Sequence, residues 1–263
     1  DSLTRHYHMI HELETTGFLQ EKILPQKVFS TDHLQLEIFS RSAEAAGGDF
    51  FAYYPNGTNR FDLHIGDVTG HSTSASLLTA YVKGQLDGYY KSQQGQVNLK
   101  DLHHHLNDNL LMVGGESASA SLLSVSFDLD RGEVCLSNSG HPEPILVDQA
   151  DAANQAYFRK RNNCILGVLA AFQAKMVGPF DVTGNQVFLL CSDGFVESLN
   201  PTGHTPKRFR TQLQDIYSTY GEGHFVEHLA QVAQPATDRD DVTFMVLKVK
   251  RWGRKAPQLQ KTS

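Results

Sequence analysis

The sequence is poor in cysteine, and its three cysteines form no recognisable pattern. Cys135, Cys164 and Cys191 are odd in number, lie far apart and include no Cys-x-x-Cys spacing. We therefore expect neither a disulfide framework nor a structural zinc site. This use of cysteine favours a reducing compartment, so we predict a cytoplasmic location.

Long apolar runs are missing as well. No run approaches the ~20 residues with which a helix spans a bilayer, and the first residues lack a basic stretch followed by an apolar one. We therefore predict no membrane partner. Because the chain begins at Asp1 instead of Met, we also expect it to be a fragment of a longer protein.

Positive charge is scarce in the body of the chain. The formal net charge is -6, and basic residues gather only in the tail, 250–263, which we predict to be disordered. A nucleic-acid partner therefore has little electrostatic support. What is present, 263 residues with 40% hydrophobic content, suffices to bury a full core. We predict one domain with short appendages.

The first appendage is a leading helix or linker at 1–23. Apolar residues recur at helical spacing from Leu3 to Leu13, and Pro25 ends the pattern. Polar surface exceeds apolar surface in this segment, so two interpretations stay open. The helix is either a linker or the seam of a homodimer, with a possible regulatory role, or it is part of the core.

The stretch Phe61–His71 organises the rest of the chain. Phe61, Leu63 and Ile65 alternate with polar residues as in a half-buried strand, and Asp67 stands between two glycines where this strand ends. An isolated Asp before a turn is commonly a cap or an Asx turn. Other acidic positions must therefore decide whether Asp67 binds a ligand.

Asp49 is the first such position. It opens a strand at 50–54, and Pro55-Asn56-Gly57 turns the chain back into the strand that ends at Asp67. In an antiparallel hairpin the start of one strand lies beside the end of its partner. We therefore predict that the Asp49 and Asp67 carboxylates lie at the same end of a sheet.

The remaining pattern alternates helices and strands. We predict helices at 72–90, at 99–112 and around 209–217 and 225–232, a hairpin of 120–129 with 133–138, strands at 34–40, 145–147, 173–179, 186–191 and 242–249, and a polar excursion at 148–163. The helix at 99–112 contains His103-His104-His105. Consecutive helix positions point in different directions, so we predict a solvated face or part of the core there and no metal cluster.

Four acidic sites share one context. Asp49 precedes a strand, Asp67 and Asp193 follow strands beside glycine, and Asp240-Asp241 precedes a strand. Carboxylates gathered at one sheet edge would raise each other's pKa unless a cation neutralised them. Oxygen ligands suit magnesium or manganese better than zinc. Two such ions ~3.5–4 Å apart can activate a shared water for in-line attack on a phosphate.

Six motifs, in their order along the chain, resemble those of metal-dependent PPM (type 2C) protein phosphatases, and in particular the bacterial SpoIIE-like branch. The motifs are Ala45–Phe51, Ile65–His71, Ser139–Pro142, Leu166–Val168, Cys191–Gly194 and Asp240–Thr243. The resemblance places a phosphatase domain at 24–249. It implies an α+β fold, a four-layer αββα sandwich of two antiparallel sheets flanked by helices, with two divalent cations, manganese or magnesium, at one sheet end.

The same resemblance implies roles for individual residues. Asp67 would bridge both metals, and the backbone carbonyl of Val68 would complete one coordination sphere. Asp193 and Asp240 would hold the second metal, and Asp49 would act largely through metal-bound waters. These four carboxylates are the expected catalytic residues.

Supporting roles follow for the neighbouring positions. Asp241 lies where the family has Asn or Asp, so it is either a further metal ligand that exchanges roles with Asp240 or a supporting residue. Gly48, Gly70 and Gly194 would permit close approach of the backbone to the metal loops.

The chain departs from the family pattern at several positions. Glu44 stands where the animal branch has a phosphate-binding Arg, Thr69 stands where that branch has a His, and Ser72 replaces a frequent Gly. Phosphate anchoring and protonation of the leaving group are therefore unassigned. His71 and His141 are expected to structure their loops.

The implied function is hydrolysis of phosphoserine and phosphothreonine in proteins by a two-metal-activated water. The SpoIIE-like branch further implies an output domain of a bacterial signalling regulator. The expected partners are a phosphorylated anti-sigma-factor antagonist of the STAS type and a sensory or receiver domain upstream of Asp1.

Two alternatives belong to other classes. Gly47–Phe51 superficially resembles the Gly-Gly-Asp-Glu-Phe signature of diguanylate cyclases, but Phe50 replaces the Glu and the other acidic sites would have no role. The stronger rival is a catalytically inactive phosphatase fold that sequesters a regulatory partner. The complete acidic set argues against it.

Overall fold

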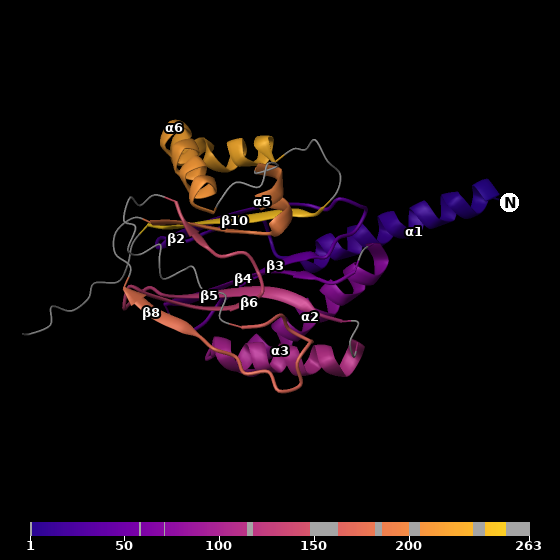
Figure 1. The fold of residues 1–263 in the computed structure, drawn as a ribbon, viewed down its shortest axis with the longest axis horizontal. Helices are drawn as coiled ribbons and strands as arrows, with labels where there is room; N and C mark the ends of the chain where they lie inside the picture. The colour runs from indigo at the N-terminus through magenta and orange to yellow at the C-terminus, as the bar shows by residue number, and fades with distance from the viewer. Residues whose placement is uncertain are drawn as a thin grey trace, which may run out of the picture.

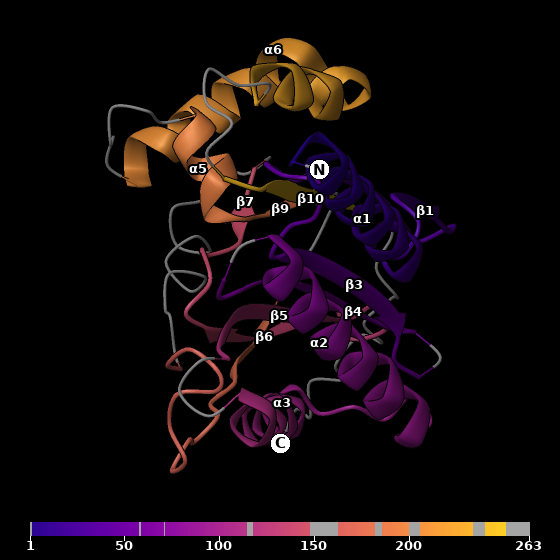
Figure 2. The ribbon, with the colours of Figure 1, turned by 90° about the vertical axis from the view of Figure 1, so that its right-hand side faces the viewer.

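The computed structural model describes residues 2–57, 59–70, 72–114, 118–147, 163–181, 186–199, 206–233 and 240–250 (Figure 1). Two antiparallel sheets of five strands each pack face to face. Helices cover the outer face of both sheets, as two views at right angles show (Figures 1 and 2). This arrangement confirms the predicted α+β fold and its four αββα layers.

The first sheet, which we call sheet A, has the strand order β1-β2-β10-β9-β7. Its strands are β1 (Val28–Ser30), β2 (Leu34–Arg41), β10 (Val242–Val249), β9 (Gln186–Cys191) and β7 (Ile145–Leu146). Helices α5 (Asp193–Leu199) and α6 (Pro206–Val232) lie over its outer face (Figure 2).

The second sheet, sheet B, has the order β3-β4-β5-β6-β8. Its strands are β3 (Asp49–Pro55), β4 (Arg60–Val68), β5 (Ala120–Asp128), β6 (Glu133–Ser139) and β8 (Val177–Asp181). Helices α2 (Ser72–Ser92) and α3 (Leu99–Gly114) cover its outer face (Figure 2). The leading helix α1 (Ser2–Ile23) runs beside α2, and its N-terminal end projects beyond the sandwich (Figure 1).

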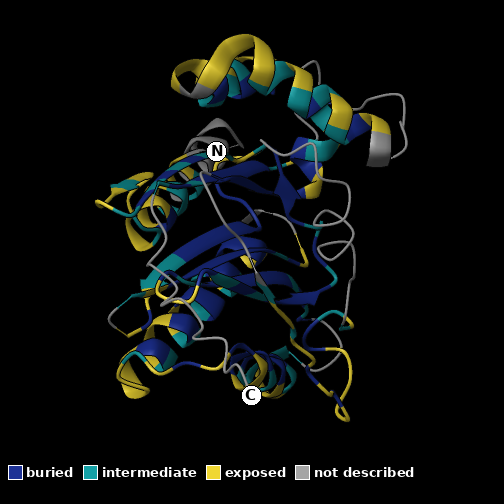
Figure 3. Cartoon of the chain, turned by 90° about the vertical axis from the view of Figure 1, so that its left-hand side faces the viewer, coloured by how far each residue is buried: buried dark blue, intermediate teal, exposed yellow. Residues whose placement is uncertain are grey.

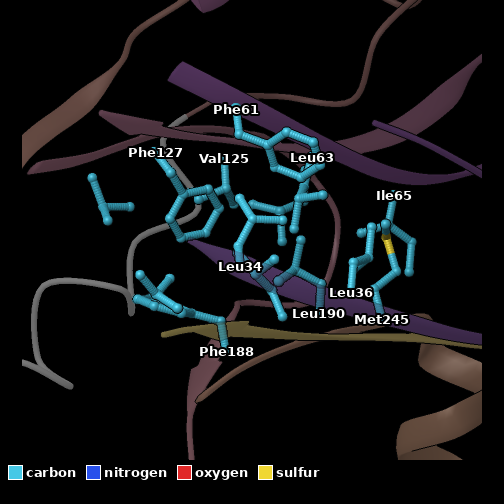
Figure 4. Packing of buried hydrophobic residues seen from close by; sticks show 14 of the residues in the cluster. Leu34, Leu36, Phe61, Leu63, Ile65, Val125, Phe127, Phe188, Leu190 and Met245 are labelled. Carbon is cyan, nitrogen blue, oxygen red and sulfur yellow. The ribbon is translucent and has the colours of Figure 1, made fainter. Parts of the chain in front are cut away.

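Apolar side chains fill the space between the sheets. Leu34 and Leu36 of sheet A meet Leu63 and Ile65 of sheet B, and all four are buried (Figure 4). The strands are buried through most of their length, whereas the helices expose their outer sides (Figure 3). The alternation of Leu63 and Ile65 with polar residues therefore marks the face of β4 that enters this core.

Two further cores lie between each sheet and its helices. In α2, Ala75, Val82 and Leu86 recur at helical spacing and are buried against sheet B. Phe209 and Leu213 of α6 are buried against sheet A in the same way. These periodic positions explain why the helical segments were predictable.

The structure corrects several boundaries. The strand predicted at 173–179 is β8, which begins only at Val177. The two helical segments predicted around 209–217 and 225–232 form one element, α6, interrupted at Gly221, whose φ is 65° and ψ is 179°. Helix α5 and the short strand β1 were not predicted. The excursion at 148–163 and the tail at 250–263 lie outside the described residues, except for Asn163 and Lys250.

The histidines of α3 diverge, as their consecutive positions predicted. His103 is buried and hydrogen-bonded to Ser124 and Ser139 of sheet B. His104 Nε2 accepts a hydrogen bond from the backbone N–H of Ala174, and His105 faces α2. These rings structure the interfaces around α3. None of the helices in the described part of the chain is long and apolar enough to cross a membrane.

Candidate metal centre

The register of β3 and β4 places two carboxylates directly opposite each other. Asp49, the first residue of β3, pairs with Asp67 near the end of β4. Residues 55–60 between the two strands form the connection, in which the Asn56 backbone N–H donates to Arg60 O at 2.9 Å. The prediction that both carboxylates lie at one end of a sheet is confirmed.

Asp49 is buried without compensation for its charge. Its side chain is part of a residue only 7% exposed, and its Oδ2 has no hydrogen-bond partner. Burial, followed by the charges of Asp241 and Asp67, raises the pKa of Asp49 well above its usual value. A proton or a cation at this position would relieve the unfavourable charge.

Asp67 lies at the electrostatic centre of the acidic set. Burial raises its pKa to about 7, and the carboxylates of Asp193, Asp240 and Asp241 add to the effect. Asp67 belongs to sheet B, whereas the other three flank β9 and β10 of sheet A. Acidic residues from four separate segments, including Asp49, therefore share one electrostatic environment.

Asp193 and Asp240 form the exposed side of this set. Asp193 is the first residue of α5, and its Oδ1 accepts a hydrogen bond from the Gly194 N–H at 3.1 Å. Asp240 lies just before β10, and partial burial followed by the charge of Asp193 raises its pKa. The structure thus places both where resemblance assigned the ligands of a second metal.

Asp241 has a different environment from Asp240. Its carboxylate accepts hydrogen bonds from the backbone N–H groups of Ala43 (2.8 Å), Gly48 (2.6 Å) and Asp49 (3.2 Å). Three backbone donors on one carboxylate hold the loop before β3 against the start of β10. Of the two roles left open for Asp241, these contacts favour the supporting one.

Two glycines are required by close contacts at the site. A Cβ at Gly48 would overlap Asp67 Oδ1 and approach Val68 O, and a Cβ at Gly194 would overlap the backbone of Asp241. The close backbone approach predicted for both is therefore present. Gly70 differs, because its φ of 117° lies in the region that favours glycine and lets the chain turn from β4 into α2.

The donors fit a hard divalent cation in their chemistry. Among the described residues no three His, Cys, Asp or Glu side chains form a group that could already hold an ion. The donors at this end are nevertheless carboxylate and carbonyl oxygens, which magnesium and manganese prefer. The orphaned Oδ2 of Asp49 and the raised pKa of Asp67 mark positions where added positive charge would be favourable.

His141 structures its loop, as expected. Its backbone N–H donates to Asn138 Oδ1 at 2.9 Å, and Asn138 Nδ2 donates to His141 O at 3.0 Å. Its ring Nδ1 lies 2.8 Å from Ser121 Oγ, which also accepts a hydrogen bond from the Asp67 N–H. His141 therefore supports Asp67 through Ser121. His71 lies outside the described residues.

Sequence reasoning missed the residues that hold the loop before β3. Gln20 of α1 and Thr79 of α2 both hydrogen-bond to Gly47. Neither residue stands beside an acidic motif, so only the fold brings them to the site. Helix α5 left a weak signal, since Phe195 and Leu199 are spaced by four and are both buried.

Comparison with known proteins gives one family match and distant relatives. A family model described as Stage II sporulation protein E (SpoIIE) matches residues 57–250, more than half of the chain. Phosphoserine phosphatase RsbP of Bacillus subtilis (strain 168) is 25% identical over 142 residues, which cover 53% of this chain and 34% of that protein. The alignment thus spans only a minor part of the longer relative.

Solved structures agree with the fold. A crystal structure of the RsbU and RsbW domains of Rv1364c from Mycobacterium tuberculosis superposes with a TM-score of 0.63 at 20% identity, covering 84% of this chain and 61% of the other. The SiaA-PP2C domain of Pseudomonas aeruginosa superposes with a TM-score of 0.62 at 17% identity, covering 94% and 98%. At these identities the likeness concerns the fold.

Proposed function

Because the chain belongs to the Stage II sporulation protein E (SpoIIE) family, we propose that it is a metal-dependent serine/threonine protein phosphatase. The observation that carries the proposal is Asp67, whose pKa is raised to about 7 by burial and by carboxylates from both sheets. Such a set is unfavourable without bound cations. The fold spends stability on a site that only positive charge can satisfy.

The roles of the residues follow from their placement. Asp67 and the Val68 carbonyl would hold cations at the end of β4, Asp193 and Asp240 would hold a second cation, and Asp49 would act largely through waters. When bound, two divalent cations supply Lewis-acid charge that lowers the pKa of water and neutralises phosphoryl oxygens. The buried wall at Asp49 would limit the number of competing solvent molecules.

The activity is tested by hydrolysis of a phosphoserine or phosphothreonine peptide with and without manganese. We expect metal-dependent release of phosphate by the wild type and its loss in Asp67→Ala and Asp193→Ala. Hydrolysis that persists in Asp193→Ala, or that needs no metal, would contradict the proposal.

The substrate we propose is a phosphorylated anti-sigma-factor antagonist of the STAS type. Membership in the SpoIIE family supports this substrate, and so does the likeness to RsbP and to a chain that joins RsbU and RsbW domains. Incubation of the phosphorylated STAS protein with the manganese-loaded enzyme should remove its phosphate. An intact phosphoprotein alongside a hydrolysed peptide would exclude this substrate and leave the activity standing.

The leading helix supports a proposal about assembly. Phe18 and Leu19 of α1 are 59% and 55% exposed, which is unusual for large apolar side chains on a helix that projects from its domain. We propose that α1 pairs in a homodimer and connects to an upstream sensory or receiver domain in the cytoplasm. Deletion of 1–22 should shift the association state measured by analytical ultracentrifugation, and an unchanged state and rate would contradict the pairing.

The rival function is an inactive phosphatase fold that sequesters a regulatory partner. One observation favours it, since the described carboxylates do not converge into a ready ligand group. Under this rival, wild type and Asp67→Ala would be equally inert with manganese and would bind the STAS protein equally well. A manganese-dependent difference between them would exclude it.

A further inference from the structure

The loop at 43–48 joins β2 to β3 and forms one wall of the proposed cation site. It carries Gly48 against Asp67 Oδ1 and Val68 O. It also delivers Asp49 to its place opposite Asp67. The conformation of this loop therefore sets the relative position of two of the proposed ligands.

Gln20 holds this loop from the side of the leading helix. Its Nε2 donates to Gly47 O at 2.7 Å, and its Oε1 accepts from the Gly47 N–H at 3.1 Å. The side-chain amide thus satisfies both backbone groups of one residue, as a neighbouring strand would. Gln20 is only 7% exposed, so water cannot readily replace these bonds if the side chain is removed.

The backbone of α1 also touches the loop directly. A Cβ at Gly17, one turn before Gln20, would overlap the backbone oxygen of Ala45. Gly17 and Gln20 lie on the same face of the helix, whereas Phe18 and Leu19 are exposed. The docked face of α1 is therefore narrow, and it rests on the loop itself.

The other two anchors of the loop belong to the body of the domain. Asp241 accepts hydrogen bonds from three backbone N–H groups at 43, 48 and 49. Thr79 Oγ1 of α2 donates to Gly48 O at 3.1 Å and lies 3.4 Å from Gly47 O. Gln20 alone comes from a segment whose far end projects beyond the sandwich (Figure 1), so it is the anchor that an upstream movement would reach.

We propose that Gln20 is a positioning residue that couples docking of α1 to binding of divalent cations at Asp49 and Asp67. The inference rests on the cation site of the proposed function and adds the route by which the leading helix acts on it. With α1 docked, the Gly47 peptide is fixed and the ligands are preorganised. Coupling is reciprocal, so bound cation also strengthens docking of α1.

The test measures manganese binding by calorimetry in the full chain, without any substrate. We expect Gln20→Ala to weaken manganese affinity about tenfold, within the usual range for coupled sites. Leu19→Ala is the matched control, because it shortens an exposed neighbour on the same helix. It should leave the affinity unchanged. Gln20→Glu keeps the size but loses the Nε2 donor to Gly47 O, and it should also weaken binding.

Hydrogen exchange of the loop amides supplies a readout that needs no metal. Gln20→Ala should speed exchange at Gly47 and Gly48 in the metal-free protein, and manganese should slow exchange in α1 of the wild type. Equal affinity and equal exchange in wild type and Gln20→Ala would overturn the inference while leaving the proposed function intact. A wild type that binds no manganese would instead remove the cation site, and with it the coupling.

Discussion

Sheet B carries two polar clusters on opposite faces, and they differ in how their charges are satisfied. Asp67 shares a face with Leu63 and Ile65, toward sheet A, where it meets the carboxylates described above. His64 lies on the other face, toward α2 and α3, within a network of hydrogen-bonded side chains. We call these the carboxylate cluster and the histidine network.

The histidine network is nearly complete within the chain. Its members form a continuous series of contacts of 2.7 to 2.9 Å from Asp62 through Tyr90, His64, Ser124 and His103 to Ser139. Burial lowers the pKa of both imidazoles to about 3, so the rings are neutral at pH 7 and each ring nitrogen has a partner. Only Asp62 Oδ1 is left without one.

The carboxylate cluster lacks such completion. None of the ion pairs among the described residues involves Asp49, Asp67, Asp193 or Asp240. Buried polar groups that are satisfied internally stabilise one packing of the chain, whereas buried like charges are unfavourable until a ligand arrives. The contrast assigns structure to one face of sheet B and chemistry to the other.

The largest expected effect separates two aspartates of the same strand. Asp67→Asn should lower the phosphatase rate at least about a thousandfold, equivalent to about 4 kcal/mol. It should not lower the melting temperature of the metal-free protein, because it removes an unfavourable charge. The matched variant Asp62→Asn should lower the melting temperature and spare the rate per folded molecule. Activity retained by Asp67→Asn would break the comparison.

A smaller effect is expected within the histidine network. His103→Leu leaves two buried serine hydroxyls without a partner, so we expect a loss of about 3 kcal/mol in the free energy of unfolding, measured with urea at pH 8. His104→Leu serves as the control, since the ring is half-buried and accepts one hydrogen bond from the backbone of Ala174. Similar losses in both variants would contradict the special role of the network.

The network should also be sensitive to acid. A histidine whose folded pKa is depressed from 6.5 to about 3 contributes stability above the unfolded pKa, and this is lost as pH falls toward the folded one. The advantage of wild type over His103→Leu should therefore shrink by about 1.3 kcal/mol between pH 7 and 5.5. Paired urea titrations measure this difference and cancel the carboxylates, which titrate in both proteins. A constant difference would show that the ring is not held neutral.

Most of the fold was predictable because local signals agreed with it. The alternation in 61–67 and the turn at 55–57 determine a hairpin, and a hairpin forces Asp49 beside Asp67. The contact of Gln20 with Gly47 was not predictable, because a polar residue in a mostly polar helix carries no signal of its destination. His103 was hidden for a related reason, since its neighbours in the sequence point to other partners.

The local signal was misleading at the end of β9. Asp193-Gly194 reads as a strand end followed by a turn, as at Asp67, but the chain enters α5 directly. Asp193 is suited to this place because a carboxylate in the first turn interacts favourably with the helix dipole. A seven-residue helix offers too few apolar positions for its period to be visible, so its existence depended on packing against sheet A.

The smallest expected effect distinguishes two adjacent aspartates before β10. Asp241 holds three backbone N–H groups, and an amide in its place would turn a donor toward at least one of them. Asp241→Asn should therefore cost about 1 kcal/mol in the free energy of unfolding. Asp240→Asn, at an exposed position, should leave stability unchanged and weaken manganese affinity instead. Urea titration and calorimetry on both variants measure the two quantities. If Asp241→Asn weakened manganese binding without loss of stability, Asp241 would be the ligand and the roles of the two residues would be exchanged.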